Sequence, residues 1–240
     1  MTNKKAIIYV LAASAVLSTG CTRRQERSRN ADKYDQWLES LTDSVAALQE
    51  TQKLTEDSLS ALYTGVDEML RKFSYVDNPR EVEGYTILSS RRGSYPLTRT
   101  GISARIAKSE DFEIIAVLSG GSFTHITLSD GTSTAGSATV PHDQGLNYRS
   151  GNLNTVLFSG PEADSIGTFV AKDPSRSITV AYGNRSERLQ PSDAQMIAET
   201  WTLAKMRKDI RRMELSIPVI SKKIDACRRK MEQRKEKMTT

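Results

Sequence analysis

The stretch LESLTDSVAALQETQKLTEDSLSALYTGVDEMLRKF, residues 38–73, decides the fold. Apolar, small or uncharged residues recur in it at alternating spacings of three and four. These positions are Leu38, Leu41, Val45, Leu48, Gln52, Thr55, Leu59, Leu62, Val66, Met69 and Phe73. Such a sustained heptad repeat is typical of a coiled-coil seam. The first arm is predicted over residues 32–77, and Asn78-Pro79 ends it. As a helix, its heptad series from Tyr34 to Phe73 would be about 58 Å long.

The same spacing returns near the C-terminus and predicts a second arm over residues 192–238. Its seam positions are Met196, Glu199, Leu203, Met206, Ile210, Met213, Ile217, Ile220, Ile224, Cys227 and Met231. Pro191-Ser192 and Asp193 supply the signals of a helix start. Two arms of nearly equal length on either side of a central segment favour an antiparallel hairpin, in which each arm covers the seam of the other.

Opposite charges on the two arms support this pairing. Residues 32–70 hold nine acidic residues and two lysines, whereas residues 196–240 hold thirteen basic and six acidic residues. Flanking charges select the partner in a coiled coil, so each arm should attract the other and repel its own copy. The alternative is that both charged faces are simply solvated.

Pro218 lies within the second heptad series. A proline inside a helix removes one backbone hydrogen bond and crowds the preceding turn. In the antiparallel register Pro218 falls opposite Thr51, next to the polar seam residue Gln52. We expect a bend or a break here, with the carbonyl of Glu214 accepting a hydrogen bond from the Gln52 amide.

Residues 82–184 have a different character from the arms. Short apolar and β-branched runs alternate with turn signals such as Gly120-Gly121, Asp130-Gly131 and Asp173-Pro174. The runs include residues 85–88, 102–106, 112–118, 124–128, 155–158, 168–170 and 177–182. Seven or eight short strands at this spacing predict a small all-β sandwich or barrel. The predicted fold class is α+β, a long antiparallel coiled-coil hairpin flanking this central domain.

The N-terminus has the organisation of a signal peptide, predicted over residues 1–20. Lys4 and Lys5 precede an apolar run from Ala6 to Val16, and small residues follow. A helix that spans a membrane needs about 20 apolar residues, which is longer than this run.

The string Leu17-Ser18-Thr19-Gly20-Cys21 resembles the lipobox of bacterial lipoproteins, with Ser18 where that family usually has Leu. The resemblance implies cleavage before Cys21, a diacylglycerol on its thiol and an acyl chain such as palmitate on its amine. Acyl chains of this kind hold a protein at a membrane without a spanning helix.

The segment after Cys21 is expected to be a disordered tether, residues 21–31, because residues 22–30 contain no apolar side chain. Thr22-Arg23-Arg24 lacks the acidic residues that direct some lipoproteins to the inner membrane or the cell surface. The resemblance therefore implies the periplasmic side of the outer membrane, with the inner membrane left open.

Composition narrows the class of protein. The 240 residues are 38% hydrophobic, 26% charged and 6% aromatic, which excludes a disordered chain and a membrane protein with many spans. The net charge of +5 is modest for a nucleic-acid binder of this size, so no nucleic-acid partner is expected.

No catalytic or metal-binding pattern is present in the sequence. His125 and His142 are the only histidines, and no Gly-x-Ser-x-Gly motif occurs. Two histidines without clustered carboxylates or thiols match no metal-ligand spacing. The sequence therefore predicts no enzyme, no metal site and no cofactor.

The loop of residues 141–149 is the candidate ligand-binding site. It brings several kinds of polar side chain together in a short segment: His142, Asp143, Gln144, Asn147, Tyr148 and Arg149. Such a set is able to hydrogen-bond and stack on a sugar or a peptide, and loops on a rigid sheet commonly carry binding. The alternative is a polar surface turn.

Three triplets resemble an acceptor pattern for periplasmic O-glycosylation in some bacteria. They are Asp43-Ser44-Val45, Asp57-Ser58-Leu59 and Asp164-Ser165-Ile166. The acceptors would be Ser44, Ser58 and Ser165, and the sequence leaves open whether they are used. Cys227, within the second seam, is expected to be a small buried hydrophobic residue.

These features predict an envelope lipoprotein that acts as a structural or adaptor protein. It would be held at the membrane through Cys21 and present its β-domain on a coiled-coil stalk. Its partner would be another envelope protein or a glycan. The alternative is a ligand-binding lipoprotein that recognises a glycan or a peptide through loops of the β-domain.

Overall fold

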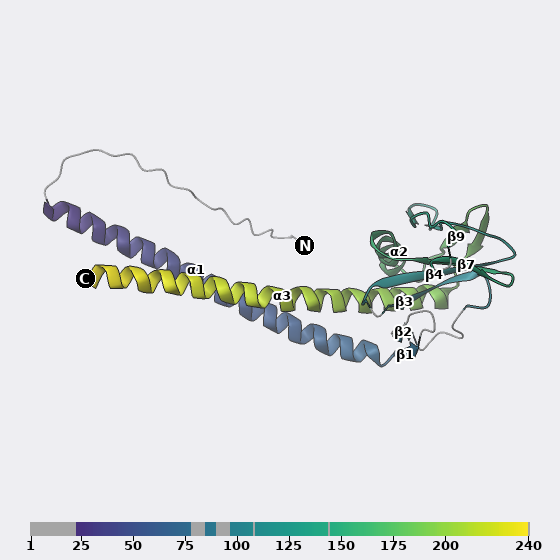
Figure 1. Ribbon diagram of the computed structural model, residues 1–240, viewed down its shortest axis with the longest axis horizontal. Helices are drawn as coiled ribbons and strands as arrows, with labels where there is room; N and C mark the ends of the chain where they lie inside the picture. The colour runs from purple at the N-terminus through teal and green to yellow at the C-terminus, as the bar shows by residue number, and fades with distance from the viewer. Residues whose placement is uncertain (1–22, 78–84, 90–96, 108, 144, 240) are drawn as a thin grey trace. The chain divides into compact units, whose positions relative to one another are not determined.

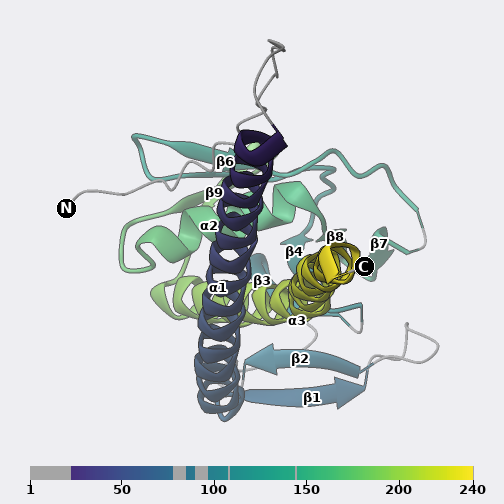
Figure 2. The ribbon, with the colours of Figure 1, turned by 90° about the vertical axis from the view of Figure 1, so that its left-hand side faces the viewer.

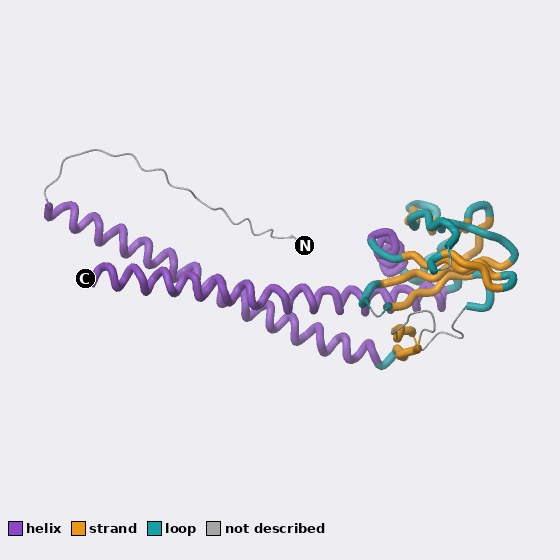
Figure 3. The backbone as a smooth tube through the Cα atoms, in the orientation of Figure 1, coloured by secondary structure: helices purple, strands orange, loops and turns teal. Residues whose placement is uncertain are grey.

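The computed structural model describes residues 23–77, 85–89, 97–107, 109–143 and 145–239 (Figure 1). Its elements are α1 (Arg23–Leu70), β1 (Phe73–Asp77), β2 (Tyr85–Ser89), β3 (Gly101–Ile106), β4 (Phe112–Ser119), β5 (Thr127–Ser129), β6 (Thr134–Gly136), β7 (Asn147–Ser150), β8 (Leu153–Phe158), α2 (Pro161–Lys172), β9 (Thr179–Tyr182), β10 (Arg185–Arg188) and α3 (Pro191–Thr239). The fold is mixed α+β, with two long helices at the ends of a β-rich segment (Figure 3).

The strands form two antiparallel sheets. One has six strands in the order β1-β2-β3-β4-β8-β7, and the other has four in the order β10-β9-β5-β6. In the described part of the chain neither sheet closes on itself, so the barrel alternative is wrong. The register places Ile114 beside Ala104 and Phe158 in the larger sheet, and Leu128 beside Ala135 and Val180 in the smaller one.

The chain divides into two compact units that cut across both long helices. One unit comprises residues 50–222 and holds every strand, α2 and the adjoining parts of α1 and α3. The described part of the other consists of residues 23–49 of α1 and 223–239 of α3. None of the helices in the described ranges is both long and apolar enough to cross a membrane.

The first part of α3 belongs to the core of the larger unit. Ile197 and Leu203 are fully buried in one apolar cluster with strand residues such as Ile114 and Val180. Figures 1 and 2 show α2 and the β1–β2 hairpin on opposite sides of this part of α3. The helix predicted as a stalk is therefore also a central element of the β-rich domain.

In the larger unit α1 and α3 pack against each other in an antiparallel orientation. Lys72, just after α1, lies 3.9 Å from Glu199. Gly65 faces Met206, and Tyr63 donates a hydrogen bond to Glu214. Leu59, Leu62, Val66 and Met69 pack on the cluster that contains Leu203 and Ile210.

The smaller unit shows the same sense of pairing. The guanidinium of Arg234 lies 4.6 Å from the centre of the Trp37 ring. Further along α1, the Thr42 hydroxyl lies 4.0 Å from the sulfur of Met231. Val45 and Ile224 are buried. Residue numbers therefore rise along α1 as they fall along α3 in these contacts.

α1 differs from the predicted first arm at both ends. It begins at Arg23, so the predicted disordered tether is helical from that residue, and Cys21 lies outside the described residues. Arg, Gln and Glu are good helix formers, which explains this extension. The helix ends at Leu70, where the Lys72 amide donates to the Met69 carbonyl. Phe73, predicted as the last seam residue, begins β1 instead.

The central domain is not all-β, because residues 161–172 form α2 where residues 168–170 were predicted as a strand. Pro161 starts the helix, and Glu162 and Asp164 lie in its first turn. Proline at the first position and acidic residues in the first turn both stabilise a helix N-terminus. Its buried residues, Ala163, Ile166, Gly167 and Val170, follow helical spacing. The sequence predicted a strand because residues 168–170 are three consecutive β-branched or aromatic residues, which are typical of strands.

α3 is one continuous helix with Pro218 inside it, so the break expected there does not occur. The expected hydrogen bond from Gln52 to the Glu214 carbonyl is also absent. The Gln52 amide donates instead to Glu56 at 2.9 Å, one turn further along α1. Packing along the rest of the helix offsets the cost of one missing backbone hydrogen bond.

Packing is close where α2, β4 and α3 meet. The Phe112 and Trp201 rings lie edge to face at 5.1 Å. A Cβ atom on Gly167 would lie 2.8 Å from Trp201 and 2.9 Å from Phe112. Only glycine fits between these rings.

We expect Gly167→Ala to lower the free energy of unfolding by about 1–3 kcal/mol, because overpacking forces both rings to move. This should outweigh the better helix propensity of alanine, which is worth about 1 kcal/mol. Gly136→Ala is the matched control, since a Cβ there has no neighbour closer than 3.8 Å. Thermal unfolding of both variants checks this, and equal midpoints would refute the packing described for α2.

Candidate functional site

The 141–149 loop enters the edge strand β7 of the larger sheet. His142, Asp143 and Arg149 are exposed, whereas Tyr148 is half-buried and Asn147 is buried. Gln144 lies outside the described residues. The candidate ligand-binding residues therefore do not form one exposed set.

The Asp143 carboxylate organises the loop itself. One of its oxygens accepts hydrogen bonds from the backbone amides of Leu146 and Gly145, both at 2.6 Å. These two donors, that of Leu146 first, lower the pKa of Asp143 below its ordinary value. One oxygen is thus engaged within the turn, as is common for Asp in loops.

Asn147 is a positioning residue beneath the loop. Its amide nitrogen donates to the carbonyls of Phe123 (3.1 Å) and Val140 (2.8 Å). Its oxygen accepts from the Asn154 amide at 2.9 Å, and the Asn154 oxygen accepts from the Phe123 amide at 2.9 Å. Both asparagines are 2% exposed. They join β7, β8 and the segments on either side of β5 and β6 rather than facing a ligand.

Two arginines converge on the turn that follows β4. Arg149 donates to the Gly121 carbonyl at 2.8 Å, and Arg185, the first residue of β10, donates to the Ser119 carbonyl at 2.9 Å. The sequence marked Gly120-Gly121 as a turn. It gave no signal for Arg185, because that residue follows the turn by more than sixty positions.

His125 and His142 are exposed, and a ring nitrogen of His125 lies 3.4 Å from the Thr124 hydroxyl. Within the described ranges no group of three or more His, Cys, Asp or Glu side chains is placed to hold a metal ion.

The three serines of the glycosylation-like triplets are exposed on helices. Ser44 and Ser58 lie on α1, where their hydroxyls donate to the carbonyls of Ser40 and Leu54, each at 2.7 Å. Ser165 lies on the exposed side of α2. Cys227 is a half-buried free thiol.

A charged junction ties the domain to α3. Glu110, in the turn before β4, lies 2.7 Å from Arg207 and 3.9 Å from Arg211. Its φ of 68° is unusual for a residue other than glycine. A cavity of about 720 Å³ adjoins this cluster and is also lined by Tyr63 and Glu214. The hydrogen bond between these two raises the pKa of Tyr63.

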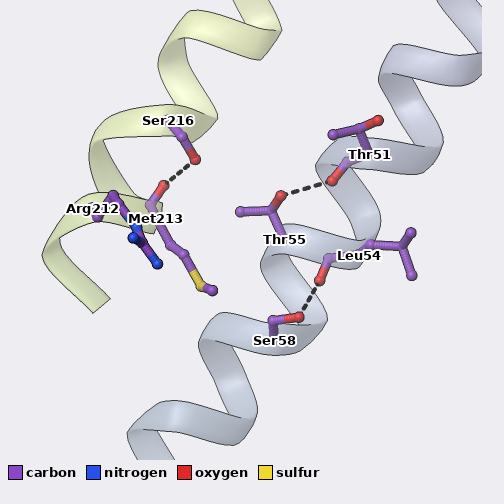
Figure 4. Close-up of a pocket in the computed structure, with 7 residues that line it drawn as sticks. All are labelled: Thr51, Leu54, Thr55, Ser58, Arg212, Met213 and Ser216. Carbon is purple, nitrogen blue, oxygen red and sulfur yellow. Dashed lines mark hydrogen bonds between the residues drawn. The ribbon is translucent and has the colours of Figure 1, made fainter. Parts of the chain in front are cut away.

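A second hollow lies between α1 and α3, about 420 Å³ in volume (Figure 4). It is lined by Thr51, Leu54, Thr55, Ser58, Arg212, Met213 and Ser216. Thr55 and Ser58 donate to carbonyls one turn earlier in α1, and Ser216 donates to the Met213 carbonyl. The hydroxyls of Thr55, Ser58 and Ser216 are therefore engaged within their own helices.

The chain matches no known family model, no curated protein and no solved structure.

We expect Asn147→Ala to cost about 1–3 kcal/mol in the free energy of unfolding, because it removes the side-chain donor to the carbonyls of Phe123 and Val140 and leaves the Asn154 amide only the Tyr148 carbonyl as an acceptor. Asn152→Ala is the control, since Asn152 is exposed and its side-chain amide donates to the Ser119 hydroxyl at 3.2 Å. Chemical denaturation measures both. Equal stabilities for the two variants would argue against a positioning role for Asn147.

Proposed function

We propose that the protein is a lipid-anchored protein of the bacterial cell envelope with a structural or adaptor role. In this proposal α1 and α3 form an antiparallel coiled-coil stalk, and the two sheets form a small sandwich carried by it. Acyl chains on Cys21 hold the chain at the periplasmic side of the outer membrane. The partner is another envelope protein or a glycan.

The observation that carries the proposal is the burial pattern of the long helices. Every heptad position of α1 from Leu38 to Met69 is buried or half-buried. The same holds in α3 for every heptad position from Met196 to Met231. Apolar sequence period and burial therefore coincide along both helices, which supports a seam rather than a solvated rod.

The adaptor role is favoured over small-ligand binding by the state of the 141–149 loop. Asp143 is engaged with backbone amides, Asn147 is buried, and Arg149 bonds the Gly121 carbonyl. A sugar or peptide would find few of the loop's polar groups free. The long helices, in contrast, offer extended charged surfaces to a protein partner.

The lipid anchor rests on the lipobox resemblance and agrees with the described helices, none of which crosses a membrane. O-glycans on Ser44, Ser58 and Ser165 belong to the same proposal, and the exposure of these serines on helices is compatible with it.

Cysteines introduced as Leu62→Cys and Met206→Cys should form a disulfide within one chain, because Leu62 and Met206 pack on the same cluster. The native Cys21 and Cys227 are replaced by serine in this experiment. Leu62→Cys with Val219→Cys is the control, since Val219 lies more than three helical turns further along α3. Crosslinks found only between chains would replace the hairpin by a swapped oligomer.

Cys21→Ala should leave an uncleaved precursor that incorporates no lipid label, because the thiol is the site of acylation. Cys227→Ala is the matched control and should be labelled and processed like the natural chain. Metabolic labelling with a fatty acid, followed by fractionation of membranes, measures both. A labelled and membrane-bound Cys21→Ala protein would contradict the anchor.

A further inference from the structure

We propose that the hollow between α1 and α3 is the contact surface for a second copy of this chain. Three of the large apolar side chains that the described residues leave exposed lie at this level. They are Leu54, Leu215 and Val219, which are 60%, 68% and 51% exposed. Single exposed leucines are ordinary, but a group of apolar side chains beside a hollow is typical of an interaction site.

Leu54, Leu215 and Val219 lie along the two sides of the hollow, one formed by α1 and the other by α3. Thr51, Leu54 and Ser58 succeed each other at helical spacing along one side of α1. Arg212 and Ser216 line the opposite wall on α3, and Leu215 and Val219 continue that side at the same spacing. Figure 4 shows the Leu54 side chain directed away from Met213 and Arg212, so α3 of the same chain does not cover it.

The lining of the hollow is suited to contact with apolar side chains. The hydroxyls of Thr55, Ser58 and Ser216 donate within their own helices, so these residues offer the hollow mainly methyl and methylene groups. These short side chains leave about 420 Å³ between the two helices. Larger apolar side chains from outside would fill this space and gain dispersion contacts that the isolated chain lacks.

Charge identifies the occupant. Residues 50–70 of α1 carry five acidic residues and one lysine, whereas residues 205–222 of α3 carry six basic and two acidic residues. A second copy whose α3 lies on this α1 brings opposite charges together, and α1 against α1 brings like charges together. An anionic lipid surface would meet the same repulsion from α1.

A two-fold axis parallel to the helices satisfies these constraints. It places α3 of each copy on α1 of the other, so one contact is made twice. Leu54 lies at the level of Met213 and Ser216 in its own chain. The axis preserves this level, so Leu54 of one copy meets Leu215 and Val219 of the second copy. Glu50 then lies near Lys222 of the second copy, at the rim of the apolar contact.

The geometry is tested with two versions of the full chain, both with Cys21 and Cys227 replaced by serine. One carries Leu54→Cys and the other Val219→Cys. We expect oxidation of a mixture to form disulfides between a Leu54→Cys chain and a Val219→Cys chain. Few disulfides should form between two chains that carry the same substitution. A mixture that yields mainly disulfides between two Leu54→Cys chains, or none between chains, would overturn the proposal.

The affinity is tested by sedimentation of the full chain in detergent over a range of concentrations. We expect a dimer whose dissociation constant rises at least tenfold in Leu54→Glu. Leu146→Glu is the matched control, because Leu146 is a similarly exposed leucine of the β-rich domain. A monomer at all concentrations, or an equal effect of both variants, would overturn the proposal. Neither result would bear on acylation of Cys21 or on pairing of α1 and α3 within one chain.

Discussion

The structure depends on the mutual burial of two apolar seams that neither long helix is able to bury alone. An isolated helix gains most of its stability in a protein from packing of its apolar face. α1 packs on the core through Leu59, Leu62, Val66 and Met69, against a cluster that includes Leu203 and Ile210 of α3. The excess of acidic residues in α1 and of basic residues in α3 predicts this pairing rather than pairing of like helices.

α3 connects this pairing to the β-rich domain. Its first turns lie in the domain core, with Ile197 and Leu203 fully buried, and the same unbroken helix continues beyond Pro218. Gly167 and Glu110 are contact points on the domain side, one through close packing with Trp201 and one through ion pairs with Arg207 and Arg211. Displacement of α3 would therefore disturb the packing and the ion pairs of the domain.

The sequence is enough to predict an element whose residues repeat at a regular local spacing. It is not enough to predict contacts between residues that lie far apart in the chain. The heptad positions from Leu38 to Met69 were predicted, because helical spacing is a property of neighbouring residues. The end of α1 was missed because Phe73 continues the period but pairs with Ser89 of β2. The bond of Asn147 to Asn154 and its bonds to two backbone carbonyls cannot be inferred from the loop's own composition, because the partners lie elsewhere in the chain.

The most direct test of mutual burial is hydrogen exchange of backbone amides in the full chain, compared between the natural protein and Ile210→Ala. Ile210 is 9% exposed and lines the cavity that Tyr63 and Val66 of α1 also line. The account predicts that amides near Val66 in α1 and near Ile210 in α3 lose protection together, because each helix relies on the other. Faster exchange confined to α3, with α1 unchanged, would contradict it.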